Sequence, residues 1–326
     1  MSQFAFIQPR FEEFALALFR HQAGHNKVYA EWLTNLGWDA ARIAAVERVE
    51  DIPYLPIATF KQHAVTTGDF TPEVTFTSSG TTGSTPSQHH VASLETYLRN
   101  TEAIFSHFYA PPKDFAWLCL LPSYLEREGS SLVAMADHFI QQSPVEESGF
   151  FLKGFEELRY RLETLELNGV PTVLLGVTYG LLDFAEWLGK PMPLKHTIVM
   201  ETGGMKGRRV EPTREEVHRQ LKKAFGLPCI HSEYGMTELM SQAYSKGDGR
   251  FATPPHMAVL PRDLEMPLAP GPLERPAPLN IIDLANADTC AFIATEDLGT
   301  VFANGIFEVH GRMQGADLRG CNLMTL

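Results

Sequence analysis

The stretch Thr197-Ile198-Val199-Met200-Glu201-Thr202-Gly203-Gly204 (residues 197–204) joins a short apolar run to a polar loop that ends in two glycines. The run has the length of a buried strand, and clear helix signals follow it. Thr213 and Glu216 have the spacing of a capping box, and Gly226 stands where such a helix would end. Pro228-Cys229-Ile230-His231 then begins another strand. The whole segment predicts a strand, helix and strand unit of a parallel sheet.

The same alternation of strands and helices extends toward the N-terminus. It predicts an α/β fold of mostly parallel sheets covered by helices, with a smaller antiparallel C-terminal portion. Ligands of such sheets bind at the carboxyl ends of strands, so we expect the loops that begin at Ser78, Glu201 and Ser232 to converge. Strands are predicted over Phe115–Leu121 and Thr172–Val177, and helices over Ser130–Ile140, Leu152–Leu167 and Leu181–Leu188.

Composition excludes several classes of function. The chain has 326 residues, 44% of them hydrophobic, and a formal net charge of -12. This acidic balance argues against binding to nucleic acid or to an anionic membrane. No apolar run approaches the roughly 20 residues of a membrane span, and the N-terminus lacks the pattern of a signal peptide. We therefore expect a cytoplasmic protein that binds neither nucleic acid nor membrane.

Cysteine and histidine spacing predicts no metal cluster. Cys119, Cys229, Cys290 and Cys321 are far apart in sequence, so free thiols are expected. The first three have apolar neighbours and are interpreted as core residues. The adjacent pair His89-His90 lacks the third and fourth ligands that a metal site needs.

A glycine- and hydroxyl-rich loop follows the strand-like Val74-Thr75-Phe76-Thr77. Its six residues are Ser78, Ser79, Gly80, Thr81, Thr82 and Gly83. Such a loop can turn tightly and offer several backbone N–H groups to one oxyanion, which predicts a phosphate site. It matches neither the P-loop nor the dinucleotide fingerprint, and a plain surface loop is the alternative.

Two later stretches carry chemistry suited to a nucleotide. Tyr234, Gly235, Thr237 and Glu238 bring an aromatic ring, a close backbone approach, a hydroxyl and a carboxylate within five residues. These groups suit a base, a phosphate and Mg²⁺, although an ordinary loop has similar composition. Further on, Asp297 can accept hydrogen bonds from ribose hydroxyls, and Gly311-Arg312 adds a cation. An exposed turn is the alternative for Asp297.

The order of these motifs resembles that of the adenylate-forming superfamily of acyl-CoA synthetases, luciferases and peptide-synthetase adenylation domains. More narrowly, the chain looks like the acyl-protein synthetase (LuxE) family, with the phenylacetate-CoA ligases as the next nearest relatives. The resemblance runs from about residue 50 to the C-terminus. The stretches that carry it most specifically are Ile52–Ile57, Pro122–Arg127, Gly176–Tyr179, Glu201–Gly207 and Arg319–Cys321.

This resemblance implies ATP and Mg²⁺ as cofactors, a carboxylic acid as substrate, with fatty acids among the candidates, and an acyl-adenylate as product. Residues 1–310 would form the acyl-adenylating domain, with a helical segment over 1–50, a Pro-rich antiparallel subdomain over 253–310 and a hinge-like tail over 311–326. The implied roles are the β- and γ-phosphates for Ser78–Gly83, the adenine pocket for Gly203, Gly204 and Tyr234, the α-phosphate for Thr237, Mg²⁺ for Glu238, and ribose for Asp297 with Arg312 beside it.

Two departures from the superfamily pattern bear on the chemistry. Pro86 is followed by Ser87 where many members have lysine, so the nearby histidines or Lys206 are candidates to replace that charge. The sequence ends soon after Arg312, so we expect the C-terminal domain that carries the catalytic lysine of relatives to be missing. The LuxE resemblance implies acyl transfer to Cys321, while an inert cysteine is the alternative.

The acyl pocket is expected where Thr178, Tyr179 and Gly180 meet the segment 122–131. Ser130-Ser131 there either orients the substrate or only caps the next helix. The acyl group would pass to a thiol, with an acyl-carrier, acyltransferase or reductase protein as partner, and a homodimer is also considered. Two other functions stay open: a non-catalytic nucleotide- or acyl-binding subunit of a larger complex, and an acyltransferase that uses preformed acyl donors.

Overall fold

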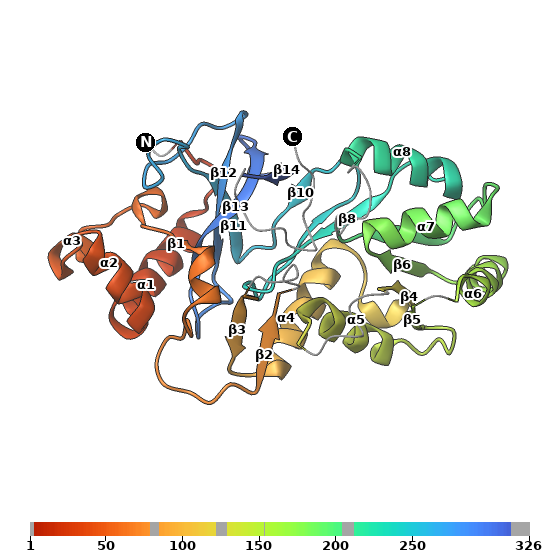
Figure 1. The fold of residues 1–326 in the computed structure, drawn as a ribbon, viewed down its shortest axis with the longest axis horizontal. Helices are drawn as coiled ribbons and strands as arrows, with labels where there is room; N and C mark the ends of the chain where they lie inside the picture. Colours follow the sequence, from red (N-terminus) through yellow and green to blue (C-terminus); the bar gives the residue numbers. More distant parts are fainter. Residues whose placement is uncertain (1–2, 79–84, 122–128, 153, 204–211, 314–326) are drawn as a thin grey trace.

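The computed structural model describes residues 3–78, 85–121, 129–152, 154–203 and 212–313, and all statements on structure concern these residues. Its main feature is a twelve-stranded sheet in the order β11-β12-β13-β14-β10-β9-β8-β7-β6-β4-β5, with β1 paired to β13. Figure 1 shows helices α5 to α8 around one half of this sheet and α1 to α3 beside the other. The predicted α/β fold is confirmed.

The half of the sheet with helices on both faces is parallel, as the alternating pattern predicts. In Figure 1, α7 and α8 lie above its strands, and α4 and α5 lie below them. The strands are β4 (Ala116–Leu120), β5 (Gly149–Phe151), β6 (Thr172–Gly176), β7 (Thr197–Glu201) and β8 (His231–Tyr234). The helices are α4 (Leu94–Phe108), α5 (Ser131–Gln142), α6 (Phe155–Leu167), α7 (Thr178–Leu188) and α8 (Arg214–Phe225).

Local signals place these elements well, with shifts of a few residues at their ends. Helix α8 has the predicted capping box between Thr213 and Glu216, and Gly226 ends it in the left-handed conformation. Helix α7 begins at Thr178, three residues before the prediction, and β8 begins at His231 rather than at Pro228. The exact ends of helices and strands depend on tertiary contacts as well as on local sequence, which explains both differences.

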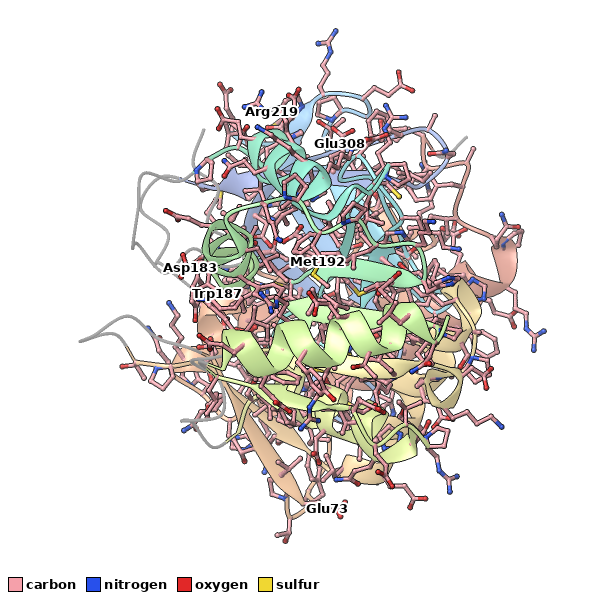
Figure 2. All side chains as sticks on the ribbon, turned by 90° about the vertical axis from the view of Figure 1, so that its right-hand side faces the viewer. Glu73, Asp183, Trp187, Met192, Arg219 and Glu308 are labelled. Carbon is pink, nitrogen blue, oxygen red and sulfur yellow. The ribbon has the colours of Figure 1, made fainter. Side chains whose placement is uncertain are left out.

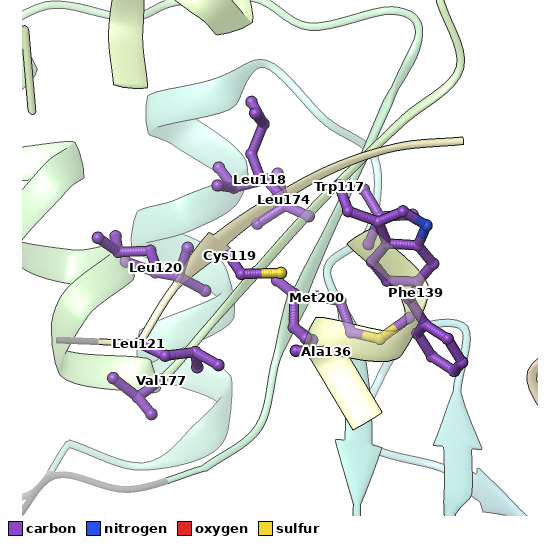
Figure 3. Close-up of a cluster of buried hydrophobic side chains, with 14 of the residues drawn as sticks. Trp117, Leu118, Cys119, Leu120, Leu121, Ala136, Phe139, Leu174, Val177 and Met200 are labelled. Atoms are coloured by element: carbon purple, nitrogen blue, oxygen red, sulfur yellow. The ribbon is translucent and has the colours of Figure 1, made fainter. Parts of the chain in front are cut away.

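The core of the parallel half is formed by strands that are apolar on both faces. Residues of β4 and β6 are buried throughout. Figure 3 shows Met200 of β7 beside Ala136 and Phe139 of α5, which identifies the face of the sheet that α4 and α5 cover. Burying a Leu, Val, Phe or Met side chain contributes about 1.5–3 kcal/mol. The buried side chains of this core therefore stabilise the parallel half of the sheet.

The other half of the sheet is antiparallel from β8 onward, except for the parallel pair of β1 and β13. A second hydrophobic cluster joins it to the N-terminal helices. Its strands are β1 (Leu55–Pro56), β9 (Ala243–Ser245), β10 (Phe251–Ala252), β11 (Met257–Pro261), β12 (Pro276–Asp283), β13 (Phe292–Val301) and β14 (Phe307–Arg312). The helices are α1 (Pro9–His25), α2 (Lys27–Asn35) and α3 (Ala40–Ala44), and the Asn26 side chain caps α2.

The strand that precedes the glycine-rich loop is not part of the large sheet. Strand β2 (Val74–Thr77) forms an antiparallel hairpin with β3 (Gln88–Val91). The expectation that the loop at Ser78 follows a strand of the parallel sheet is therefore wrong, although β2 itself lies where it was predicted. In the described part of the chain, short 3-10 helices lie at Val49–Asp51, Ile57–Lys61 and Pro112–Asp114.

Among the described residues, no helix combines the length and the apolar character needed to cross a membrane.

Candidate functional site

The predicted phosphate loop is described only at its ends. Ser79, Gly80, Thr81, Thr82 and Gly83 lie outside the described residues, as does Gly204 of the predicted adenine pocket. The Ser78 N–H donates to the Ser87 carbonyl at 3.0 Å, and the Ser87 N–H donates to Ser78 Oγ at 2.8 Å. These two bonds hold the ends of the loop together, so the loop begins and ends at one point of the hairpin.

His89 ties this hairpin to the predicted nucleotide motif. It is fully buried, with Nδ1 at 2.8 Å from the carbonyl of Thr237 and Nε2 at 3.1 Å from Thr289 Oγ1. Burial lowers the pKa of His89 to about 4, so it is neutral at pH 7. His89 therefore does not replace the positive charge of the missing lysine, and it acts instead as a structural link to Thr237. Lys206 lies outside the described residues.

Tyr234, Asp297 and Arg312 come together, as the motif order predicted. Tyr234 Oη donates to Asp297 Oδ2 at 2.8 Å, and Arg312 Nε lies 3.4 Å from Asp297 Oδ1. Asp297 of β13 stands directly opposite Arg312 of β14. All three side chains are almost fully buried, and the Tyr234 ring packs on Phe251 and Phe307. Their roles toward ribose and adenine stay predictions.

The residues between Gly235 and Glu238 form the turn that leaves β8. Gly235 and Thr237 are half-buried, whereas Glu238 is fully buried and its carbonyl accepts a hydrogen bond from Asn286 Nδ2 at 2.9 Å. No three His, Cys, Asp or Glu residues of the described chain form a group that could hold a metal ion. One carboxylate beside phosphate oxygens is nonetheless chemistry that suits Mg²⁺, which usually keeps several non-protein ligands.

Glu201 organises the start of the predicted adenine loop, a role that the sequence did not suggest. Its Oε2 accepts hydrogen bonds from the Gly203 N–H at 2.6 Å and from Thr178 Oγ1 at 3.0 Å. Its Oε1 lies 3.4 Å from Arg214 Nε and 3.6 Å from His218 Nε2. Burial alone would raise the pKa of Glu201, but His218 and Arg214 outweigh it and lower the pKa to about 2.

Glu233 is a second buried glutamate, and it has the opposite protonation state. It lies on β8 directly opposite Tyr244 of β9. Burial, with the nearby charge of Glu201, raises the pKa of Glu233 to about 8, so the side chain is protonated at pH 7. The only sequence signal for Glu233 was a carboxyl residue just before Tyr234-Gly235. The pattern of apolar and polar residues in the sequence does not reveal its protonation state.

A groove with a volume of about 570 Å³ runs between α8 and β14. Figure 2 shows Arg219 of α8 and Glu308 of β14 on the same side of the molecule, at this groove. Arg214 and His218, the partners of Glu201, also line it. The ion-pair cluster around Glu201 therefore lies between Gly203, where the predicted adenine loop begins, and an open surface groove.

The described residues of the predicted acyl pocket lie at the start of α5 and in the first turn of α7. Ser130 Oγ accepts a hydrogen bond from the Val133 N–H at 3.3 Å, so it caps α5, which was the alternative to a substrate contact. Tyr97 Oη of α4 donates to the Ser131 carbonyl at 3.0 Å. Tyr179 and Gly180 are buried in α7. Residues 122–128 lie outside the described chain.

The cysteines divide into two kinds. Cys119 and Cys290 are fully buried as predicted, and burial raises the pKa of both thiols, that of Cys290 to about 12. Cys229, predicted to be in the core, is only half-buried, with its Sγ 3.7 Å from His231 Nε2. The prediction for Cys229 is wrong because the residue lies before β8 begins, outside the buried part of the strand. Cys321 lies outside the described residues.

Comparison by sequence alone is uninformative, since no family model and no curated protein matches the chain. Solved structures do match. 2-Hydroxyisobutyryl-CoA ligase, in an open conformation in complex with 2-HIB-AMP and CoA, is similar with a TM-score of 0.66 at 11% identity, over 97% of this chain and 80% of that one.

Two further ligases match over less of their length. O-succinylbenzoate coenzyme A synthetase from Bacillus subtilis, in complex with ATP and magnesium ion, has a TM-score of 0.52 at 13% identity, over 75% of this chain and 52% of that one. A long-chain-fatty-acid-CoA ligase from Archaeoglobus fulgidus has a TM-score of 0.52 at 13% identity, over 73% and 51%. The present chain spans about half the length of these two proteins. It has the α/β fold of the large domain of adenylate-forming enzymes.

Proposed function

We propose that this protein activates a carboxylic acid as its acyl-adenylate, with ATP and Mg²⁺, and then transfers the acyl group to a thiol or another nucleophile. The observation that carries the proposal is the convergence of distant motifs on the fold of acyl-CoA ligases. His89 contacts the carbonyl of Thr237, and Tyr234 donates to Asp297 next to Arg312. These contacts between segments far apart in sequence support one shared site for the predicted motifs.

Each predicted site residue would bind a different part of ATP or the metal ion. Ser78–Gly83 would hold the β- and γ-phosphates, and Thr237 the α-phosphate. Glu238 would bind Mg²⁺, which neutralises phosphate charge when bound. Asp297 and Arg312 would bind the ribose side, and Gly203, Gly204, Tyr234 and Gly235 the adenine side. The acid needs no general base because its carboxylate is already ionised at neutral pH, so positioning and charge neutralisation would supply the catalysis.

The LuxE resemblance supports a narrower version of the proposal. In that version the acyl group passes to Cys321, and a reductase or acyltransferase partner takes it onward. A thiolate beside the cation of Arg319 would attack an acyl-adenylate readily. Intact-mass measurement after incubation with ATP and acid should then detect an acyl adduct that is lost in Cys321→Ser. An adduct of equal yield in that variant would overturn the assignment of Cys321.

Carboxylate-dependent exchange of pyrophosphate into ATP tests the adenylation step directly. Glu238→Gln, which keeps the shape of the side chain, should lower Mg²⁺-dependent exchange by at least about 100-fold. Asp297→Asn should weaken ATP binding measured by calorimetry while preserving the acceptor for Tyr234. Glu265→Ala removes an exposed carboxylate from the loop between β11 and β12 and serves as the control. Melting temperatures of all variants show whether the fold survives.

The alternatives have distinct outcomes in the same assays. ATP binding without exchange until a second protein is added would favour a nucleotide-binding subunit. Acyl transfer from an acyl-CoA in the absence of ATP would favour an acyltransferase. Full exchange activity in both Glu238→Gln and Asp297→Asn would overturn the assignment of these residues.

A further inference from the structure

A cluster of buried polar side chains lies on the face of the sheet that α4 and α5 cover, at the ends of β7 and β8. Glu233 of β8 is directly opposite Tyr244 of β9, so their side chains share one face. Gln242 follows on the same face, with its Cγ only 3.5 Å from the position that a Cβ of Gly235 would take. The exposed fractions of Glu233, Tyr244 and Gln242 are 8%, 2% and 4%. The cluster is therefore buried yet polar.

The polar atoms of this cluster lack partners within the described chain. Tyr244 Oη and Gln242 Oε1 have no hydrogen-bond partner there, and the same holds for Thr202 Oγ1 just beyond β7. No hydrogen bond to the carboxyl group of Glu233 is found in that part of the chain either. Buried polar atoms in folded proteins nearly always have a partner, so several such atoms on one face indicate that something else completes them.

Thr202 belongs to this face by position. Its N–H donates to the Gly176 carbonyl at 3.0 Å, so the backbone continues the pairing of β7 with β6 beyond Glu201. Side chains alternate along a strand, and Met200 faces α5 (Figure 3). Thr202 therefore follows Met200 on the α5 side, while Glu201 points to α8.

The cluster adjoins the predicted nucleotide motif. A Cβ at Gly235 would lie 2.5 Å from Glu233 Oε1, so the carboxyl group lies over the α-carbon of Gly235. Any other residue at position 235 would displace it. Thr237, proposed to contact the α-phosphate, is only two residues further along the chain. A group bound by the cluster would thus lie close to the reacting carboxylate of an acid substrate.

The donors and acceptors of the cluster define what it can bind. Burial raises the pKa of Tyr244 well above its ordinary value, so the phenol keeps its proton and can donate. Gln242 Oε1 can only accept, and Glu233, protonated at pH 7, can donate. A complementary ligand must offer both a donor and an acceptor. A hydroxyl group offers both, whereas an alkyl chain offers neither and an ammonium group offers only donors.

We propose that Glu233, Gln242 and Tyr244 recognise a hydroxyl group on the acyl portion of the substrate, so that the enzyme activates a 2- or 3-hydroxy acid in preference to an unsubstituted fatty acid. This inference rests on the proposed adenylating function and names its substrate class. An unsubstituted chain in the same place would leave the buried donors and acceptors without partners.

Pyrophosphate exchange with acids of matched length tests the inference. The panel comprises butanoate, 2-hydroxybutanoate, 3-hydroxybutanoate, 2-aminobutanoate and decanoate. One hydroxy acid should exceed butanoate in kcat/KM by about 100-fold or more, because a site built to bind a hydroxyl rejects the analogue that lacks it. Equal or better use of butanoate or decanoate overturns the inference, and so does a preference for 2-aminobutanoate.

Variants separate recognition from a merely structural role. Glu233→Leu should bring the ratio of kcat/KM between the preferred hydroxy acid and butanoate close to one, and Glu233→Gln should retain part of the preference. Tyr244→Phe should lower that ratio about tenfold. Tyr97→Phe is the matched control, because its hydroxyl is already bound to the Ser131 carbonyl, and it should leave the ratio unchanged. An equal loss with both acids in the three cluster variants overturns the assignment.

Binding without ATP distinguishes failure of this inference from failure of the proposed function. Ligand-observed NMR compares 3-hydroxybutanoate and 2-hydroxybutanoate with butanoate on the full-length protein. Hydroxy-acid binding that Glu233→Leu abolishes, without exchange by any acid, would support the recognition site and refute adenylation. Exchange with butanoate alone would support adenylation and refute the recognition site. Absence of selective binding together with absence of exchange would refute both.

Discussion

Glu201 and Glu233 lie on neighbouring strands at the same end of one sheet, yet their carboxyl groups have opposite protonation states at pH 7. Glu201 faces α8, where Arg214 and His218 overcome the effect of burial and lower its pKa to about 2. Glu233 faces α4, where burial and the charge of Glu201 raise its pKa to about 8. Both side chains are buried. The face of the sheet, and hence the partners, decides the charge.

Both faces carry buried polar atoms without a hydrogen bond, but on the α8 face two of these atoms, Glu201 Oε1 and Arg214 Nε, lie 3.4 Å apart as an ion pair. On the α8 face, Glu201 binds the Gly203 N–H and the Thr178 hydroxyl and joins an ion-pair cluster. On the α4 face, Tyr244 Oη and Gln242 Oε1 have no partner in the described part of the chain. The first arrangement suits a fixed support for a loop. The second suits a site that a ligand completes.

The largest expected change in stability concerns Glu201 on the α8 face. Glu201→Ala should lower the free energy of unfolding by about 3–5 kcal/mol, because it leaves the half-buried Arg214 guanidinium and the Gly203 N–H without their carboxylate. Urea unfolding measures the change. Glu95→Ala breaks an exposed pair with Arg99 on α4 and should cost less than about 0.5 kcal/mol. A loss below about 1 kcal/mol for Glu201→Ala would show that the cluster does not stabilise this face.

The second prediction uses the pH dependence of Glu233. An unfolded glutamate loses its proton near pH 4.3, whereas the folded protein keeps this proton until about pH 8. The folded state therefore binds more protons between these values, so Glu233 makes stability fall as pH rises through that window. Glu233→Gln removes this contribution. Relative to the parent, its stability should rise by on the order of 2–3 kcal/mol between pH 5.5 and 8.

Thermal melting of the parent and Glu233→Gln at several pH values from 5.5 to 8.5 provides the measurement. Glu201 does not confound it, because a carboxyl with a pKa of about 2 stays ionised throughout this range. The stability that Glu201 contributes is lost only below about pH 4.3, as pH falls toward 2. Parallel melting curves for the two proteins across the range would contradict a raised pKa of Glu233.

The smallest expected effect is a difference in stability between variants of two tyrosines, Tyr244 and Tyr97, on the α4 face. Tyr244→Phe removes a buried hydroxyl without a described partner and should raise the free energy of unfolding by about 1 kcal/mol. Tyr97→Phe removes the hydroxyl that donates to the Ser131 carbonyl and should lower it by about 1 kcal/mol. Denaturant titration of both variants should give changes of opposite sign. A similar loss in both would indicate that Tyr244 is bonded after all.

Much of the fold was predictable because its signals are local. The capping box of Thr213 and Glu216 and the cap at Asn26 lie within a few residues of the helix ends that they define. Strand β2 also lies at its predicted position. Its pairing was not predictable, because the choice between joining the large sheet and forming a hairpin with β3 depends on the path of distant segments.

The candidate site was predictable in part. Tyr234, Asp297 and Arg312 were named from motif order, and their side chains do meet. The role of Glu201 was missed, since its carboxylate contacts residues of α8. The burial of Cys229 was misjudged, since this residue lies just before β8, beside His231. Neither neighbourhood can be read from the adjacent residues alone.

The linear sequence thus determines the strands, the helices and their caps, because hydrophobic periodicity and capping act over a few residues. It also names the residues suited to nucleotide chemistry. The folded arrangement alone decides that Glu201 is ionised, that Glu233 is protonated and that His89 is a neutral link. Those states depend on charges, burial and hydrogen bonds supplied by atoms that are distant in the chain and near only in the folded protein.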